Sequence, residues 1–175
     1  MKRILLALLL LTTSCSSPVA DQAISSFAPC SSIAYKGMAA DGTFVECLDG
    51  PGSLALEGIE GPAVITVWAS WCTTCESQRK NFIRLYNESK GRFQVIGLDV
   101  SEKSKSDGYK HALAKGMAFP QLFDPDGRTV SKIAPGIPVT QFKDKNNVIT
   151  YLQVGPVTKY KDLTTLVEKY LGIKV

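Results

Sequence analysis

The pattern of apolar and polar residues predicts two buried strands joined by a helix. Residues 64–69 form an apolar run rich in β-branched side chains, which is typical of a buried strand. Apolar residues then recur within the otherwise polar stretch 76–86, which indicates an amphipathic helix. Residues 93–100 predict a second buried strand. Because a helix separates them, the two strands are expected to run parallel as a βαβ unit.

Shorter elements complete a single α/β domain. Residues 43–48 and 53–56 are predicted to pair as a hairpin, because a strong turn signal at 49–52 lies between them. The other expected elements are a helix ending near Lys115, an extended segment at 119–123, a short strand or helical turn at 129–133, paired strands at 138–142 and 148–154, and a helix at 158–171. The last helix is expected to have Thr158 as its N-cap. This order predicts a mixed central sheet flanked by helices, without a second domain.

The first residues of the chain are predicted to be an export signal rather than part of the fold. Two basic residues precede a short apolar core at residues 4–11, which is too short to span a bilayer. Small residues then precede Cys15, which resembles the lipobox of bacterial lipoproteins, where cleavage leaves a lipidated cysteine. Ordinary secretory cleavage after Ala20, without a lipid anchor, is the alternative. In both cases the mature protein is expected outside the cytoplasm, and in the first it is anchored to the membrane.

The predicted organisation therefore has three parts. They are a lipoprotein-type signal peptide at residues 1–14, a tether and N-terminal loop at 15–42, and one domain at 43–175. The composition, 45% hydrophobic and 21% charged, is that of a globular protein. The net charge is +4, but no Lys/Arg cluster alternates with aromatic residues, so the sequence gives no support to nucleic-acid binding.

The number of cysteines agrees with a lipidated residue. The chain has five, and an odd count in an exported protein leaves one to explain. If Cys15 carries lipid, the others form two pairs, Cys72 with Cys75 and Cys30 with Cys47. The second pair would be a structural disulfide that stabilises the fold by roughly 3 kcal/mol. Two separate buried thiols are the alternative.

Cys72 and Cys75 form a Cys-x-x-Cys motif at the predicted start of a helix. Unpaired N–H groups and the helix dipole stabilise a thiolate there, so Cys72 is predicted to attack and Cys75 to resolve the mixed disulfide. Half of a zinc site and a static disulfide are the alternatives. The only histidine, His111, is expected to face solvent, and Cys30 and Cys47 lack zinc-ligand spacing, so no metal is predicted. No cofactor beyond the dithiol is required.

Three segments carry a resemblance to a known family. Residues 64–75 resemble the strand and Trp-Cys-x-x-Cys turn of the TlpA/ResA family of membrane-anchored thiol–disulfide oxidoreductases. Residues 119–127 and 136–140 resemble two later segments of that family, and the likeness runs from about Cys47 to the C-terminus. It implies a thioredoxin-like fold in which Pro138 is cis and faces the disulfide.

Two departures from the family leave its chemistry open. Thr74 stands where relatives usually have proline between the cysteines, and residues 78–80 replace the usual Glu-x-Pro. The redox potential and the direction of electron flow are therefore not transferable. The fold is not threatened, because Gln and Lys are better helix formers than Pro.

The substrate-binding residues are predicted on both sides of the motif. The backbone of Ile137, held by Pro138, is expected to pair with an extended substrate segment, unless Pro138 is an ordinary trans proline at a strand start. Trp71 is expected either to shield Cys72 and help dock substrate, or to pack in the core.

A proton acceptor for Cys75 is less evident from the sequence. Thr66 stands where cytoplasmic thioredoxins carry a buried carboxylate, and a threonine cannot accept the proton. Glu76, next to Cys75, is a candidate, with a solvated helix charge as the alternative.

The resemblance implies an extracytoplasmic enzyme that exchanges disulfides with exported proteins. It implies reduction of substrates such as apocytochrome c, with electrons from a membrane redox partner, while an oxidative role is the main competitor. The alternatives in other classes are a thioredoxin-fold peroxidase and a non-catalytic interaction module with a structural disulfide.

Overall fold

The structure, a computed structural model, describes residues 23–37 and 42–175. The predicted signal peptide, Cys15 and the alternative cleavage site at Ala20 lie outside the described residues. Within the described part of the chain, no helix has the length and apolar character needed to cross a membrane.

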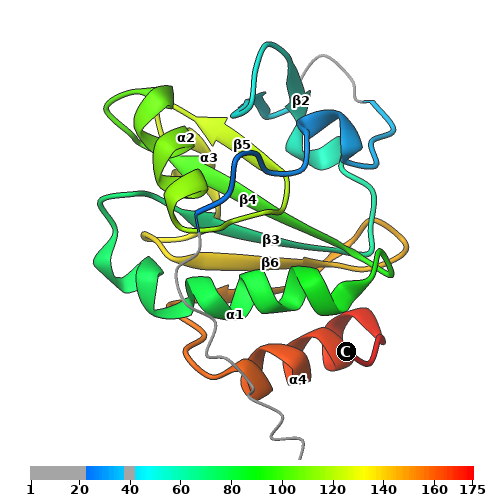
Figure 1. Ribbon diagram of the computed structural model, residues 1–175. Coiled ribbons are helices and arrows are strands. Elements are labelled where there is room, and N and C mark those ends of the chain that lie inside the picture. Colours follow the sequence, from blue (N-terminus) through cyan, green and yellow to red (C-terminus); the bar gives the residue numbers. More distant parts are fainter. Residues whose placement is uncertain (1–22, 38–41) are drawn as a thin grey trace, which may run out of the picture.

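Seven strands form one sheet in the order β2-β1-β5-β4-β3-β6-β7, with helices on both of its faces (Figure 1). The elements in chain order are η1 (Cys30–Ser32), β1 (Phe44–Cys47), β2 (Ser53–Ala55), η2 (Leu56–Gly58), β3 (Ala63–Trp68), α1 (Thr73–Ser89), β4 (Gln94–Val100), α2 (Lys105–Ala114), β5 (Gln121–Asp124), α3 (Arg128–Ile133), β6 (Val139–Lys143), β7 (Ile149–Val154) and α4 (Tyr160–Leu171).

The central strands confirm the predicted α/β class with a mixed sheet. Strands β3 and β4 are parallel and are joined by α1, and β5 continues the parallel part beside β4. On the other side of β3, β6 and then β7 pair in antiparallel fashion. The predicted hairpin of β1 and β2 is present, but it joins the same sheet, because β1 pairs with β5.

Strand β3 separates two hydrophobic layers, and all six of its residues are buried. Val64 and Trp68 pack on the side of α1, α2 and α4, together with both cysteines of the motif. Ala63, Ile65 and Val67 face the other layer, which residues 30–33 and α3 help to cover. A strand buried on both faces explains why its sequence is continuously apolar rather than alternating.

The helix boundaries follow the buried positions. Helix α1 presents Phe82 and Leu85 to the core and ends at Ser89, and its C-cap Lys90 adopts the left-handed conformation at φ 49°. Helix α4 begins at Tyr160 with Lys159 as N-cap, so the prediction of Thr158 as its cap was wrong. No side chain caps α4, and its start is fixed instead by the buried residues Leu163 and Val167.

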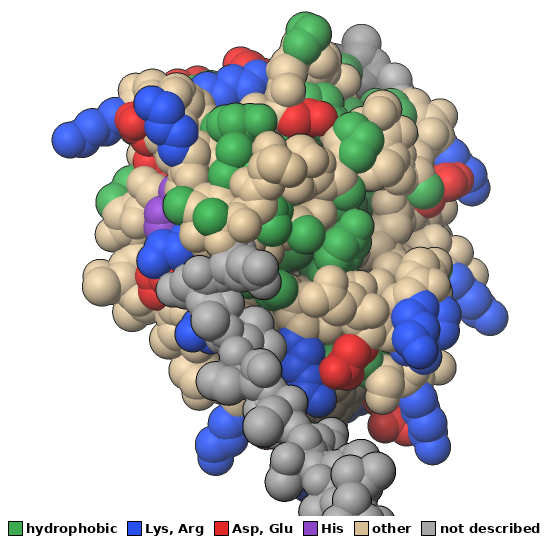
Figure 2. Space-filling model, in the orientation of Figure 1, with side chains coloured by type: hydrophobic (Ala, Val, Ile, Leu, Met, Phe, Trp, Pro, Cys, Tyr) green, Lys and Arg blue, Asp and Glu red, His purple; other side chains and the backbone are tan. Residues whose placement is uncertain are grey.

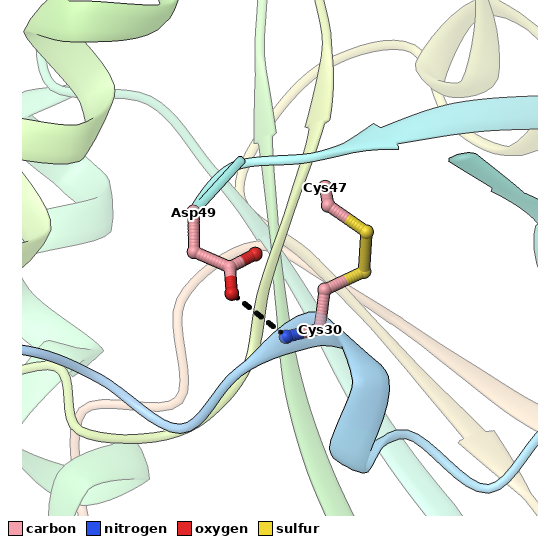
Figure 3. Close-up of side chains that lie close together, drawn as sticks. All are labelled: Cys30, Cys47 and Asp49. Atoms are coloured by element: carbon pink, nitrogen blue, oxygen red, sulfur yellow. Dashed lines mark hydrogen bonds between the residues drawn. A yellow bond between two sulfur atoms is a disulfide. The ribbon is translucent and has the colours of Figure 1, made fainter. Parts of the chain in front are cut away.

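A disulfide fastens the N-terminal segment to the sheet. Cys30 in η1 and Cys47 at the end of β1 are bonded, with their Cα atoms 5.6 Å apart (Figure 3). The carboxylate of Asp49 accepts a hydrogen bond from the backbone N–H of Cys30 at 3.1 Å. The two sulfurs and Asp49 lie close enough together to hold a metal ion, but a disulfide offers no thiolate ligand.

Charged side chains are distributed rather than clustered on the face seen in Figure 2. Lys and Arg lie around its margin, interspersed with Asp and Glu, and hydrophobic side chains occupy much of its centre. This distribution gives no basis for nucleic-acid binding on that face.

Candidate redox site

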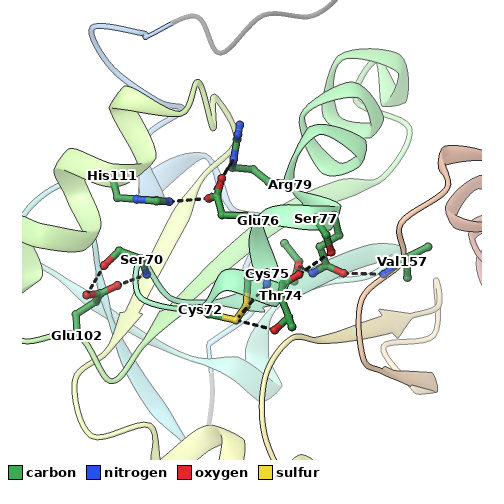
Figure 4. Close-up of a disulfide and its surroundings, with 12 residues drawn as sticks. Ser70, Cys72, Thr74, Cys75, Glu76, Ser77, Arg79, Glu102, His111 and Val157 are labelled. Carbon is green, nitrogen blue, oxygen red and sulfur yellow. Dashed lines mark hydrogen bonds and ion pairs between the residues drawn. A yellow bond between two sulfur atoms is a disulfide. The ribbon is translucent and has the colours of Figure 1, made fainter.

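The two cysteines of the motif lie at the start of α1, just after the turn that follows β3. Cys72 is the N-cap of α1, and Cys75 lies in its first turn. They form a disulfide with Cα atoms 5.3 Å apart (Figure 4). The backbone N–H of Cys75 donates to Cys72 Sγ at 3.2 Å, so the sulfur occupies the position of a capping oxygen. A thiolate on Cys72 would gain from this donor and from the positive end of the helix.

Trp71 marks the exposed side of the site. Both cysteines are buried, whereas Trp71 is 58% exposed. Its indole Nε1–H donates to the carbonyl of Ser101 at 3.0 Å, which fixes the ring beside the motif. This position favours a docking surface over core packing, the two alternatives left by the sequence.

Ile137 and Pro138 lie immediately before β6, the strand that pairs with β3 on one side. The peptide bond between them is cis, and a second cis bond, Gly61–Pro62, was not predicted. Because Val139 pairs with Val67 in the ladder, these residues lie at the end of the sheet from which the motif follows. Ile137 packs against the hydrophobic cluster that contains both motif cysteines.

The side chain of His111 is mostly buried, contrary to the expectation that it faces solvent. Its side chain is only 17% exposed, because α2 places the ring against Trp68, with ring centroids 5.6 Å apart. Its Nε2 lies 3.0 Å from Glu76 Oε1. The expectation was wrong because the polar sequence of α2 does not reveal which side of the helix packs on β3.

Glu76 is held by several cationic neighbours from α1 and α2. Arg79 Nε lies 3.1 Å and Lys115 Nζ 3.7 Å from its Oε2. Burial raises the pKa of Glu76, but Arg79, His111 and Lys115 together hold it below its usual range. Because these neighbours surround it, the Glu76 carboxylate is not simply a solvated charge on the helix surface.

Gln78 occupies the position where the resembled family carries an acid. It is buried, its amide N–H donates to Thr66 Oγ1 at 3.2 Å, and its carbonyl accepts from the N–H of Val157 at 3.0 Å. The residue therefore connects β3 to the segment before α4, and it supplies no titratable group.

Two acids lie beside the motif, and sequence reasoning did not place Glu102 there. Glu102 accepts hydrogen bonds from the backbone N–H and the hydroxyl of Ser70, two residues before Cys72. Asp99 is fully buried, and burial, followed by the nearby charge of Glu102, raises its pKa from 3.8 to about 9. An acid near the end of a buried strand and another just after it were the available signal.

Fold and site together define the thioredoxin-like class: a Cys-x-x-Cys at a helix N-terminus, next to a cis proline directly before the adjoining strand. The chain belongs to the AhpC/TSA family, which matches residues 40–152. This result agrees with the fold predicted from the sequence.

Individual relatives point to the same chemistry. The thiol:disulfide interchange protein DsbE of Escherichia coli strain K12 is 29% identical over 134 residues, covering 72% of this chain and 70% of DsbE. The thioredoxin-like protein YneN of Bacillus subtilis is 27% identical over 108 residues, covering 60% of this chain and 64% of YneN, less than two thirds of its length. The class of this chain is thus a thiol–disulfide oxidoreductase of the DsbE type.

A solved structure supports the fold independently. DsbF of Mycobacterium tuberculosis (MTB), solved in mixed oxidised and reduced forms, superposes with a TM-score of 0.65 at 20% identity, covering 77% of this chain and 99% of DsbF. The predicted TlpA/ResA subtype is a finer assignment within this class and stays a prediction.

Proposed function

We propose that this protein acts outside the cytoplasm and exchanges disulfides with exported proteins through Cys72 and Cys75. The observation that carries the proposal is the position of Cys72 Sγ at the N-terminus of α1, where it accepts the N–H of Cys75. This position stabilises the thiolate that must attack. The export-type leader in the sequence supports the location, and the name of the E. coli relative supports the reaction.

In the reductive direction the Cys72 thiolate attacks one sulfur of a substrate disulfide. A bond forms between Cys72 and that sulfur, and the other substrate sulfur leaves as a thiolate. Cys75, after losing its proton, attacks Cys72 Sγ, forms the Cys72–Cys75 disulfide and releases the second substrate thiolate. The substrate gains two electrons and the protein loses two. The oxidative direction reverses these steps.

Substrate would dock beside Trp71 and the backbone of Ile137. The exposed indole offers an apolar contact, and the backbone before Pro138 can pair with an extended segment. The family resemblance implies apocytochrome c as substrate, a membrane partner as electron donor, and a lipid on Cys15 as anchor.

The test is a trapping experiment with the full-length Cys75→Ser protein in cells that export it. Mixed disulfides with exported proteins should accumulate on Cys72 and disappear in Cys72→Ser. Capture of no partner under either oxidising or reducing conditions would overturn the proposal.

The direction of exchange follows from the redox potential of the purified protein. A potential near −270 mV favours a reductant, and one near −120 mV an oxidant. A peroxidase would instead oxidise Cys72 with hydrogen peroxide in the absence of any protein disulfide.

A further inference from the structure

The resolving step requires a proton to leave Cys75, and no carboxylate lies on β3 to take it. Thr66 holds the corresponding place on that strand and already accepts a hydrogen bond from Gln78. Gln78 itself is an amide and does not titrate. The acceptor must therefore come from another element that reaches the buried side of Cys75.

A small cavity lies behind Cys75 and is closed mainly by apolar side chains. Its volume is about 20 Å³, enough for one water molecule. It is lined by Cys75 and Thr66, by the titratable residues Glu76, Arg79 and His111, and by Trp68, Phe82 and Phe119 among its apolar walls. The cavity thus connects the sulfur of Cys75 with one group of titratable side chains.

Glu76 and His111 are the two members of that group that can take up a proton, on a carboxylate oxygen or a ring nitrogen, because the guanidinium of Arg79 stays protonated. Their 3.0 Å contact joins α1 to α2, and Figure 4 shows the imidazole pointing at the Glu76 carboxylate. Arg79, from α1, and Lys115, from the end of α2, are the cations that face this carboxylate. The walls from β3 and from residues 117–119 carry no charge.

We infer that the Glu76–His111 pair receives the proton of Cys75 through this cavity and returns it in the reverse reaction. The inference rests on the thiol–disulfide exchange proposed above. As Cys75 attacks Cys72 Sγ, its S–H bond breaks and the proton passes through a water molecule to the pair. With the His111 Nε2–H donated to Glu76, the protonated pair is an imidazolium beside a carboxylate. The departing substrate thiolate takes its own proton from solvent.

Asp99, the other unusual acid near the motif, does not fit this role. It is not among the residues that line the cavity, and the backbone of α2 closes over it, since a Cβ added at Gly108 would lie 1.7 Å from its Oδ2. The neighbouring charge that acts on its carboxyl group is that of Glu102.

The two steps can be separated with an aromatic disulfide reagent such as DTNB. Reduced protein should release a first thiolate when Cys72 attacks and a second when Cys75 resolves the mixed disulfide. In His111→Gln and Glu76→Gln we expect the second release to slow by about tenfold at pH 7, below the usual range for general acid–base catalysis because water substitutes in part. The first release should be unchanged.

The pH profile distinguishes proton transfer from a structural effect. The second release in the wild-type protein should show a titration step that both variants lose and that Glu76→Asp restores. Glu168→Gln, an exposed acid on α4, is the matched control and should keep the wild-type profile. Circular dichroism establishes that each variant is folded; if His111→Gln is not, Glu76→Gln carries the test.

His111 is the only histidine of the chain, so its ring protons give one resolvable titration by NMR. That titration should shift between the oxidised and the reduced protein. Wild-type second-phase profiles in both Gln variants would overturn the relay while leaving the exchange reaction intact. Loss of the first release in the wild-type protein would instead overturn the proposed function.

Discussion

The two disulfides of this protein have the same bond but different surroundings. Cys72 and Cys75 are three positions apart at the start of a helix, where N–H groups point at the sulfur. Cys30 and Cys47 are 17 positions apart, and the carboxylate of Asp49 lies within 4.8 Å of both sulfurs. A helix N-terminus favours a thiolate and a carboxylate disfavours one. The difference in surroundings supports the proposal that the first pair exchanges disulfides and that the second stabilises the fold.

The largest expected effect comes from removing the attacking sulfur. Cys72→Ser should lower the rate of reduction of a protein disulfide by at least about 1000-fold, as when an enzyme loses its nucleophile. Serine is a good N-cap, so α1 should persist. Stopped-flow kinetics with a fluorescent disulfide substrate measures the rate, and Cys30→Ser is the matched control. Equal losses in the two variants would remove the distinction between the disulfides.

The second prediction concerns the Cys30–Cys47 disulfide, which should contribute to stability rather than to exchange. Replacing both Cys30 and Cys47 by alanine should lower the free energy of unfolding by about 3 kcal/mol, because the loop they close no longer restricts the unfolded chain. The exchange rate of the folded protein should stay within about twofold of the wild-type rate. Urea unfolding, with Cys72–Cys75 kept oxidised in both proteins, measures the stability. A large loss of exchange in the folded variant would mean that the second disulfide takes part in the reaction.

The sequence predicted the features that depend on local pattern. The βαβ unit follows from two apolar runs around one amphipathic helix, and the position of Cys72 at a helix start follows from where the first run stops. The cis bond at Pro138 came from the family resemblance rather than from pattern. These features can be recognised from short stretches of sequence, because they depend on few long-range contacts.

The surroundings of the site could not be predicted because they join distant segments. Glu102 bonds Ser70 across 32 positions, and His111 reaches Glu76 across 35. Which side of α2 packs on Trp68 is set by tertiary contacts, and α2 is too polar for its sequence to indicate that side. In the same way, nothing in β1 alone indicates that it pairs with β5.

The third prediction compares two buried acids that end neighbouring strands. Neither Asp99 oxygen has a hydrogen-bond donor among the described residues, whereas Asp124 accepts from the N–H and hydroxyl of Thr129. Since the pKa of Asp99 is raised from 3.8 to about 9, the folded protein keeps a proton that the unfolded chain releases, and stability falls as pH rises through this window. Asp99→Asn should therefore stabilise the protein, and the gain should grow by more than about 1.4 kcal/mol between pH 4 and pH 8.

Thermal unfolding across that pH range measures the effect, and Asp124→Asn is the matched control. It should destabilise the protein, because Asn replaces a charged acceptor of two hydrogen bonds. The result would distinguish two regions of the molecule. The region of the motif contains a buried group, Asp99, that destabilises the folded protein, whereas the Cys30–Cys47 disulfide stabilises it. A pH-independent difference between Asp99→Asn and wild type would contradict the raised pKa.

The smallest expected effect concerns Thr74, which stands where the resembled family usually has proline. Its hydroxyl lies 3.4 Å from Cys72 Sγ, close enough to donate to a thiolate. Thr74→Val keeps the shape and removes the donor, at a cost of about 0.7 kcal/mol for a weak hydrogen bond. The midpoint of thiolate formation on Cys72 should rise by about half a pH unit, and the redox potential should fall by about 15 mV because the reduced form is less stabilised.

Ultraviolet titration of the reduced motif and equilibration with glutathione measure these two quantities. Thr74→Ser retains the hydroxyl and should behave as wild type, while Thr73→Val tests for a general effect of the added methyl group. Cys30–Cys47 stays oxidised in every variant, so the titration reports the motif alone. An unchanged midpoint in Thr74→Val would mean that the helix N-terminus stabilises the Cys72 thiolate without help from the residues between the cysteines. The redox potential would then have to be set by the groups that line the cavity next to Cys75, among them Glu76 and His111.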